Sequence, residues 1–232
     1  KEISDDISLE KPMRRLVQGD VGSGKTVVAA VSMYISAKNN TQSVLLCPTE
    51  VLAEQHFKNF SAWFKNSNIK IELLTGKMPV SKRRVIYQDL EDGVIDILIG
   101  THAVFQDKVK MKNLGLVVVD EQQRFGVKQR FDLVKKSSDQ IMPHQLFMTA
   151  TPIPRTLAMT IFADLETSKI DELPPGRKPV ETLVYSDKKK DEIVKRLETV
   201  CKSGNQVFWL CTMIEESENL DVQAADEAKE WI

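Results

Sequence analysis

The sequence predicts an α/β fold in which helices cover both faces of a parallel sheet. Almost uninterrupted apolar runs recur along the chain, as at residues 43–47 (SVLLC), 95–100 (IDILIG) and 114–120 (LGLVVVD). Such runs are typical of strands that are buried on both faces. Helix-like stretches separate them, which indicates parallel strands joined by helical crossovers. A glycine-rich turn at residues 19–26, between the first strand and the first helix, is the third observation.

Hydrophobic periodicity justifies the elements in chain order. Residues 25–37 are apolar nearly all round, as expected for a helix packed against a sheet. Ala53, Phe57, Phe60 and Phe64 recur at helical spacing and predict an amphipathic helix. The predicted strands are 14–18, 43–47, 69–76, 95–100, 114–120 and 144–151, and the predicted helices are 25–37, 53–64, 81–91 and 155–163.

The pattern breaks at residues 173–180 (LPPGRKPV), where three prolines and a glycine indicate a linker. We therefore place a first domain at 1–173, a linker at 174–180 and the N-terminal part of a second domain at 181–232.

The segment beyond the linker carries the start of another α/β pattern. Its predicted elements are a strand at 180–185, a helix that Asp187 caps and Gly204 follows, and a strand at 206–211. Phe208 and Trp209 are assigned to a core rather than to a base-stacking platform. Roughly 50 residues are too few to bury a good core alone, so we expect this unit to be incomplete.

Composition limits the partners of the chain. With 32 basic and 33 acidic residues it lacks the basic excess that nucleic-acid binders often show. Any contacts with DNA or RNA would therefore be local, or another part of a larger protein would supply the charge. No apolar run approaches the roughly 18 residues that span a membrane, and the N-terminus lacks a signal-peptide pattern, so a cytoplasmic setting is expected. The cysteines, Cys47, Cys201 and Cys211, are predicted to be buried thiols. The histidines, His56, His102 and His144, are predicted not to bind metal.

Residues 19–26 match the pattern G-x-x-x-x-G-K-[ST], which binds nucleotide phosphates. Its glycines let backbone N–H groups turn toward phosphate oxygens, and the following helix directs its N-terminus at the anion. Lys25 would place its ammonium at the β- and γ-phosphates, and Thr26 would offer its hydroxyl to Mg²⁺. The residues predicted to bind the nucleotide are Gly19, Asp20, Val21, Gly22, Ser23, Gly24, Lys25 and Thr26.

Two carboxylates, Asp120 and Glu121, directly follow an apolar strand. Alone, such a pair is weak evidence and favours a surface turn over a site. Since the carboxyl ends of parallel strands face the ligand in this fold class, Asp120 is predicted to bind Mg²⁺. Glu121 would orient or deprotonate the attacking water.

Several motifs resemble those of superfamily-two helicases and translocases. The matching segments are 19–26 (motif I), 47–56 (Ia), 99–106 (Ib), 120–123 (II) and 148–160 (III). Over nearly the whole chain the sequence is most similar to the RecG family of bacterial branched-DNA translocases. The Mfd transcription-repair coupling factors are also similar, but residues 170–180 (IDELPPGRKPV) and 211–218 (CTMIEESE) favour the RecG family.

The resemblance implies two RecA-like lobes with ATP and Mg²⁺ bound between them, and a monomeric motor that remodels stalled forks and Holliday junctions in bacterial recombination and repair. It implies that residues 1–173 form the first lobe. The implied catalytic residues are Lys25, Asp120, Glu121 and Gln123, the coupling residues are Thr149, Ala150, Thr151 and Arg155, and the DNA-contact candidates are Pro48, Thr49, Gly100, Thr101 and His102. Gln123 departs from the family pattern, in which histidine often stands at that position.

Other interpretations stay open. Thr101 could instead cap a helix, and Arg155 could simply begin one. The basic residues Arg124, Lys128 and Arg130 are equally compatible with a solvated face and with DNA contact. The chain could also serve an Mfd-like translocase on duplex DNA, or a nucleotide-binding switch that drives no movement.

Since the wedge domain, the C-terminal hook and the second-lobe arginine finger lie outside this chain, we expect weak nucleotide binding and little turnover from it alone.

Overall fold

The structure is a computed structural model of the chain that describes residues 1–9, 11–121, 142–151, 165–172, 176–177 and 180–210. The chain divides into two compact units, Lys1–Arg177 and Lys178–Ile232. This division falls inside the linker predicted at 174–180.

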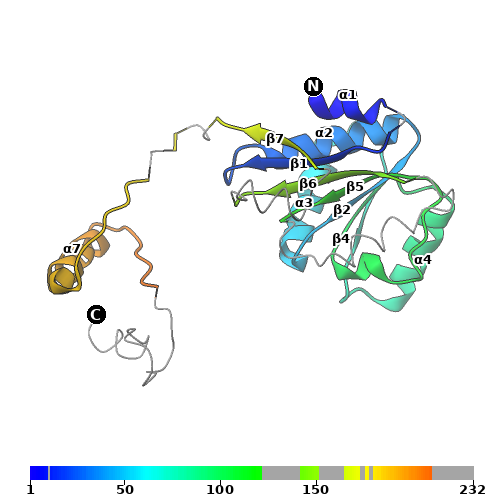
Figure 1. Ribbon diagram of the computed structural model, residues 1–232. Helices are drawn as coiled ribbons and strands as arrows, with labels where there is room; N and C mark the ends of the chain where they lie inside the picture. The colour runs from blue at the N-terminus through cyan, green and yellow to red at the C-terminus, as the bar shows by residue number, and fades with distance from the viewer. Residues whose placement is uncertain (10, 122–141, 152–164, 173–175, 178–179, 211–232) are drawn as a thin grey trace, which may run out of the picture. The chain divides into compact units, whose positions relative to one another are not determined.

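The first unit is built on a parallel sheet whose seven strands lie in the order β3-β4-β2-β5-β6-β1-β7 (Figure 1). The strands are β1 (Arg14–Gly19), β2 (Gln42–Leu46), β3 (Ile71–Leu74), β4 (Ile97–Gly100), β5 (Leu114–Val119), β6 (His144–Thr149) and β7 (Glu166–Ile170). All of the pairings are parallel. The six predicted strands are therefore confirmed.

The helices of the first unit include four that the structure describes. They are α1 (Glu2–Ile7), α2 (Lys25–Lys38), α3 (Glu50–Trp63) and α4 (Val80–Glu91), and a short 3₁₀ helix, η1, spans His102–Phe105. Helix α3 begins three residues earlier than predicted because the Thr49 hydroxyl accepts the Leu52 N–H at 3.3 Å and caps it. The helix predicted at 155–163 lies outside the described residues.

Side chains of the central strands alternate between two buried clusters, one on each face of the sheet. In β2, Val44 and Leu46 belong to one cluster and Leu45 to the other. Helix α4 contributes to the first cluster, and α2 and α3 contribute to the second, with Ile86, Leu90, Ala29, Ala30, Met33, Ala53 and Phe60. Helices thus cover both faces, as the continuous apolar strands predict.

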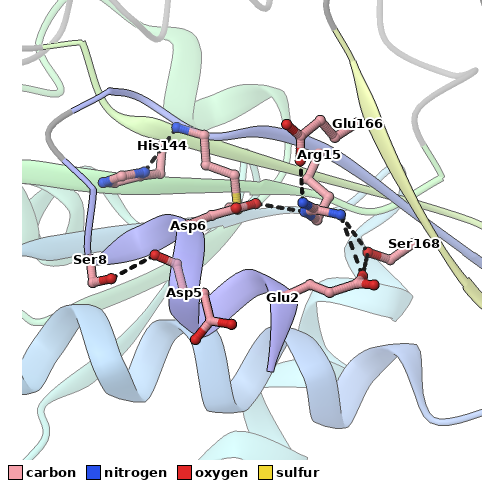
Figure 2. A network of polar contacts seen from close by, with 9 residues as sticks. Glu2, Asp5, Asp6, Ser8, Arg15, His144, Glu166 and Ser168 are labelled. Carbon is pink, nitrogen blue, oxygen red and sulfur yellow. Dashed lines mark hydrogen bonds and ion pairs between the residues drawn. The ribbon is translucent and has the colours of Figure 1, made fainter.

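Two elements of the first unit were not predicted, α1 and β7. The sequence of β7, ETSKI, is polar, and this strand lies at the edge of the sheet with most of its residues exposed. The buried Arg15 guanidinium of β1 joins both elements: its Nε donates to Asp6 at 2.7 Å, and its other nitrogens contact Ser168 and Glu166 (Figure 2). Polar residues from both α1 and β7 are therefore partners of a single arginine.

The charge of Arg15 is stabilised by this arrangement. Burial alone would lower the pKa of the guanidinium, but the hydrogen bond and charge of Asp6, with the charges of Glu166 and Glu2, raise it above its usual value. Arg15 therefore stays ionised in a site where its side chain is only 8% exposed.

The second unit, described by itself, contains a 3₁₀ turn, η3 (Asp187–Lys189), and helix α7 (Lys190–Lys202). The helix is as predicted, and Gly204 follows it with a φ of 85°. The predicted cap is wrong, because α7 begins after Lys189 rather than after Asp187.

Both strands predicted for the second unit are wrong over the residues that the structure describes. Residues 180–185 and 206–210 have no regular secondary structure. Phe208, which we assigned to a core, is 92% exposed, and Cys201 is exposed rather than buried. A strand needs a hydrogen-bonded neighbour, and the described part of this unit provides none.

Candidate nucleotide-binding site

The predicted site residues that the structure describes all lie at the end of the sheet where the strands have their carboxyl ends, here called the carboxyl edge. Because the strands are parallel, their carboxyl ends meet there: the phosphate loop follows β1, Thr149 ends β6, and Asp120 follows β5. These three strands are neighbours in the order β5-β6-β1, so β5 and β1 are about 10 Å apart across one intervening strand. Topology therefore brings together motifs that are far apart in the sequence.

The phosphate loop has the backbone geometry that anion binding requires. Gly22 and Gly24 have positive φ values of 79° and 95°, which side-chain-bearing residues rarely adopt. A Cβ atom on Gly19 would lie 2.5 Å from the Ser23 hydroxyl, so this position has room for glycine only. The Lys25 ammonium donates to the carbonyl oxygens of Gly19 and Asp20 at 2.7 and 2.8 Å.

A buried hydroxyl in this loop fits a phosphate ligand. The Ser23 Oγ atom is buried and has no hydrogen-bond partner within the described residues. Such groups are costly unless something satisfies them, and a phosphate oxygen in the loop would do so. The oxygen donors at hand, the Thr26 hydroxyl and the Asp120 carboxylate, are of the kind that Mg²⁺ prefers.

Arg177, from the predicted linker, contacts the phosphate loop. Its Nη1 atom lies 2.5 Å from Asp20 Oδ2 and 3.4 Å from the Val21 carbonyl oxygen. The Val21 N–H, then the Arg177 guanidinium, lower the pKa of the Asp20 carboxyl. No sequence pattern singled out Arg177.

Asp120 is held at the end of β5 by both main chain and side chain. Its N–H donates to the Leu46 carbonyl at 2.9 Å, which continues the pairing with β2. Its Oδ2 atom lies 2.9 Å from Nε2 of His56, on α3. Both side chains are largely buried, with 13% and 9% exposed. We predicted only that His56 binds no metal, and its contact with Asp120 was missed.

The surroundings of Asp120 also affect Cys47, the residue after β2. Burial and then the negative charge of Asp120 raise the pKa of the Cys47 thiol. Cys47 is therefore a neutral, buried thiol, as predicted.

Glu121, the predicted catalytic carboxylate, has an uncommon backbone conformation. Its φ is 50°, in the left-handed region. Residues other than glycine rarely adopt this region, and strain of this kind concentrates at functional sites.

The predicted coupling residues form a local turn after β6. The Thr149 hydroxyl, fully buried, lies 3.0 Å from the Thr151 hydroxyl and accepts the Thr151 N–H at 3.2 Å. Ala150 lies between them in the same bend. Arg155 and Gln123 lie outside the described residues, as do Arg124, Lys128 and Arg130.

The DNA-contact candidates also occupy the carboxyl edge. Thr49 is exposed and Pro48 half-buried, just before α3. Thr101 occupies the capping position of η1 but makes no side-chain cap, and His102 is exposed beside it. A Cβ on Gly100 would meet the Leu74 carbonyl at 2.5 Å, so Gly100 permits the close approach of β3.

Three further observations concern the described residues outside these motifs. Within the described residues, no group of three or more histidine, cysteine or acidic side chains could hold a metal ion. None of the helices that the structure describes is long and apolar enough to cross a membrane. Two surface hollows beside α1, at the opposite edge of the sheet, include none of the predicted site residues.

Comparison with known proteins places the chain among helicases. The family described as DEAD/DEAH box helicase matches residues 5–160. The ATP-dependent DNA helicase RecG of Haemophilus influenzae is 50% identical over 97% of this chain and 33% of its own length. RecG of Aquifex aeolicus is 49% identical over 99% of this chain and 29% of its own length.

A solved structure also matches this chain. The structure of RecG bound to a three-way DNA junction matches with a TM-score of 0.73 and 40% identity, over 88% of this chain and 27% of that chain. The resemblance to RecG predicted from the motifs is thus confirmed, and the chain spans about a third of the length of the curated relatives. Since the family match includes the phosphate loop, the paired acids and most of the sheet, the chain belongs to the DEAD/DEAH box helicase family.

Proposed function

We propose that this chain is the ATP-binding motor core of a DNA helicase that uses ATP hydrolysis to remodel branched DNA. The observation that carries the proposal is the strand order β5-β6-β1, which lines up the paired acids, the Thr149–Thr151 turn and the phosphate loop at one edge. The curated relatives are ATP-dependent DNA helicases, and the solved relative is bound to a three-way junction. Branched DNA is therefore the substrate that we propose here, in a monomeric protein of the bacterial cytoplasm.

The residues of the site would divide the work of hydrolysis. The Lys25 ammonium would exchange its bonds to the loop carbonyls for bonds to β- and γ-phosphate oxygens. Mg²⁺, held by Thr26 and Asp120, would neutralise charge on those phosphates. Glu121 would orient the attacking water and accept its proton as the water oxygen bonds to the γ-phosphorus and the bond to the ADP oxygen breaks.

Coupling to movement would start from the turn beside this site. The Thr149 and Thr151 hydroxyls form a hydrogen bond with one another. A shift of the neighbouring strand ends when the nucleotide changes would therefore move this turn as a unit. Gln123, which can donate and accept a hydrogen bond at once, would bridge the γ-phosphate to this turn. Pro48, Thr49, Gly100, Thr101 and His102 would contact the DNA backbone.

The proposal is tested by Lys25→Ala in the full-length protein, assayed for ATP hydrolysis and for unwinding of a three-way junction. We expect both activities to fall by at least about a hundredfold, since the charge on the β- and γ-phosphates is lost. Lys38→Ala is the matched control, because Lys38 lies on the same helix, is exposed and is far from the loop. Unwinding retained by Lys25→Ala would contradict a motor function.

The choice of DNA separates the proposed function from the duplex translocase. Hydrolysis stimulated more strongly by a three-way junction than by linear duplex of equal length supports the branched-DNA motor. Equal stimulation by both would favour the Mfd-like alternative.

A further inference from the structure

His56 lies where it can control the orientation of the Asp120 carboxylate. It belongs to the face of α3 that packs against the sheet, together with Ala53 and Phe60. The Phe60 ring meets the imidazole edge-on, with ring centroids 6.3 Å apart. This packing directs Nε2 at Asp120 Oδ2, 2.9 Å away, although the two residues are 64 positions apart.

The direction of this hydrogen bond follows from its partners. An ionised carboxylate only accepts, so the His56 Nε2–H donates and Nδ1 carries the lone pair. The Nδ1 atom is buried and has no hydrogen-bond partner within the part of the chain that the structure describes. Among the described residues, packing and the bond to Asp120 therefore fix the ring. A buried acceptor that the described residues leave without a partner adds nothing to stability through a hydrogen bond, so the bond to Asp120 is the polar contact that this ring makes there.

The contact leaves the two oxygens of Asp120 in different roles. Oδ2 is occupied by the His56 donor, which leaves Oδ1 as the oxygen that does not share this hydrogen bond. Carboxylates that bind metals are commonly oriented by such hydrogen-bonded partners, and losing one typically weakens metal affinity about 10–100-fold. Because Thr49, the capping residue of α3, lies just after β2, the same helix also connects the end of β2 to this carboxylate.

We infer that His56 is a positioning residue that orients the Asp120 carboxylate for Mg²⁺ through the Nε2–H···Oδ2 bond. The inference rests on the proposed function, because it assumes that Asp120 serves a Mg²⁺–nucleotide complex. His56 touches neither nucleotide nor metal in this scheme. Its effect is to hold one carboxylate rotamer and to keep Oδ2 from competing for the ion.

The test measures binding rather than turnover. In the full-length protein, the affinity for a fluorescent ADP analogue is measured over a Mg²⁺ titration and in excess EDTA. We expect His56→Phe, which keeps the ring packing but removes the donor, to raise the Mg²⁺ concentration for half-maximal tightening about tenfold or more. Affinity in EDTA should stay within about twofold of the parent, because the phosphate loop is unchanged. His56→Gln, whose amide N–H reaches a similar position, should restore the parent's Mg²⁺ dependence within about threefold.

Asp120→Asn serves as the reference in the same titration. If it abolishes the effect of Mg²⁺ while His56→Phe behaves as the parent, the inference about His56 is overturned and the proposed site stands. If Asp120→Asn leaves the effect of Mg²⁺ unchanged, the proposed function fails at this residue and the inference falls with it. Loss in both His56 variants would show a packing role only, and would also overturn it. Should His56→Phe fail to give a cooperative thermal transition, His56→Met replaces it, since methionine also lacks a donor and adapts to the cavity.

Discussion

Helices α2 and α7 show what separates the two units of this chain. Both were predicted from their sequence, and both formed. Helix α2 buries Ala29, Ala30 and Met33 against the sheet, whereas no residue of α7 is buried in the described structure. Yet α7 has the more sharply segregated apolar face, with Ile193, Val194, Leu197 and Val200. Periodicity thus predicts a helix, but burial depends on a partner surface that periodicity cannot supply.

The strands of the two units differ in the same way, and more strongly. The apolar segment of β2 pairs with β4 on one side and β5 on the other, and all five of its residues are buried. The segment 206–210 is comparably apolar but forms no strand, and Phe208 and Leu210 are each 92% exposed. A helix satisfies its hydrogen bonds within itself, but a strand relies on a neighbour.

The largest expected difference between the units is in the aromatic core. Phe60 is fully buried and contacts the rings of His56, Trp63 and Phe64. We expect Phe60→Ala to lower the free energy of unfolding by about 3–5 kcal/mol. Phe208→Ala, in the second unit, should change it by less than about 0.5 kcal/mol. Urea unfolding followed by circular dichroism measures both, and comparable losses would show that the second unit has a core of its own.

Thiol reactivity should separate the units next. Cys201 is exposed, whereas Cys47 is buried and burial raises the pKa of its thiol. In a Cys211→Ser background, we expect a disulfide reagent to label Cys201 on the order of a hundred times faster than Cys47 under native conditions, because Cys47 must await local unfolding. Cys201→Ser should remove the fast phase. Rapid labelling that persists in that variant would place Cys47 in an open structure and weaken the contrast.

Two arginines provide a smaller, charge-based comparison. Arg15 is buried among Asp6, Glu166 and Ser168, while Arg196 of α7 is exposed and donates to Tyr185 at 3.3 Å. We expect Arg15→Met to lower the unfolding free energy by about 2 kcal/mol, because α1 and β7 lose their common partner. Arg196→Met should cost less than about 0.5 kcal/mol. Hydrogen exchange of the α1 and β7 amides checks the cause, since protection should fall there and remain in β2.

These contrasts explain what the sequence could predict. The central strands and the phosphate loop carry local signals, such as the apolar run of β5 and the spacing of Gly19, Gly24 and Lys25, and they were predicted. Strand β7 was missed because its residues become informative only once Arg15 is known to be their partner.

The candidate site divides in the same way. Asp120 and Glu121 were found from their place after a strand, but the contact of Asp120 with His56 joins residues 64 positions apart. Arg177 lies 156 residues beyond the Val21 carbonyl that it contacts. No local sequence pattern predicts either contact. The packing of α3 on the sheet creates the first, and the return of the chain from β7 to the phosphate loop creates the second.

The smallest expected effect concerns pH and a histidine for which the described second unit has no counterpart. His144 accepts the Met13 N–H through Nδ1 at 3.0 Å, and burial lowers the pKa of its ring although Asp6 partly opposes this (Figure 2). The unfolded chain therefore takes up the proton more readily, so stability is fully present above the ordinary value of 6.5 and is lost as the pH falls below it. His144→Asn keeps an acceptor but cannot titrate, and the stability difference between parent and variant should shrink from pH 8 to pH 5. Thermal melts across this pH range measure the stability difference. A difference that stays constant would show that protonation of the ring does not affect stability, and that only the acceptor, bonded to Met13, connects β1 to β6.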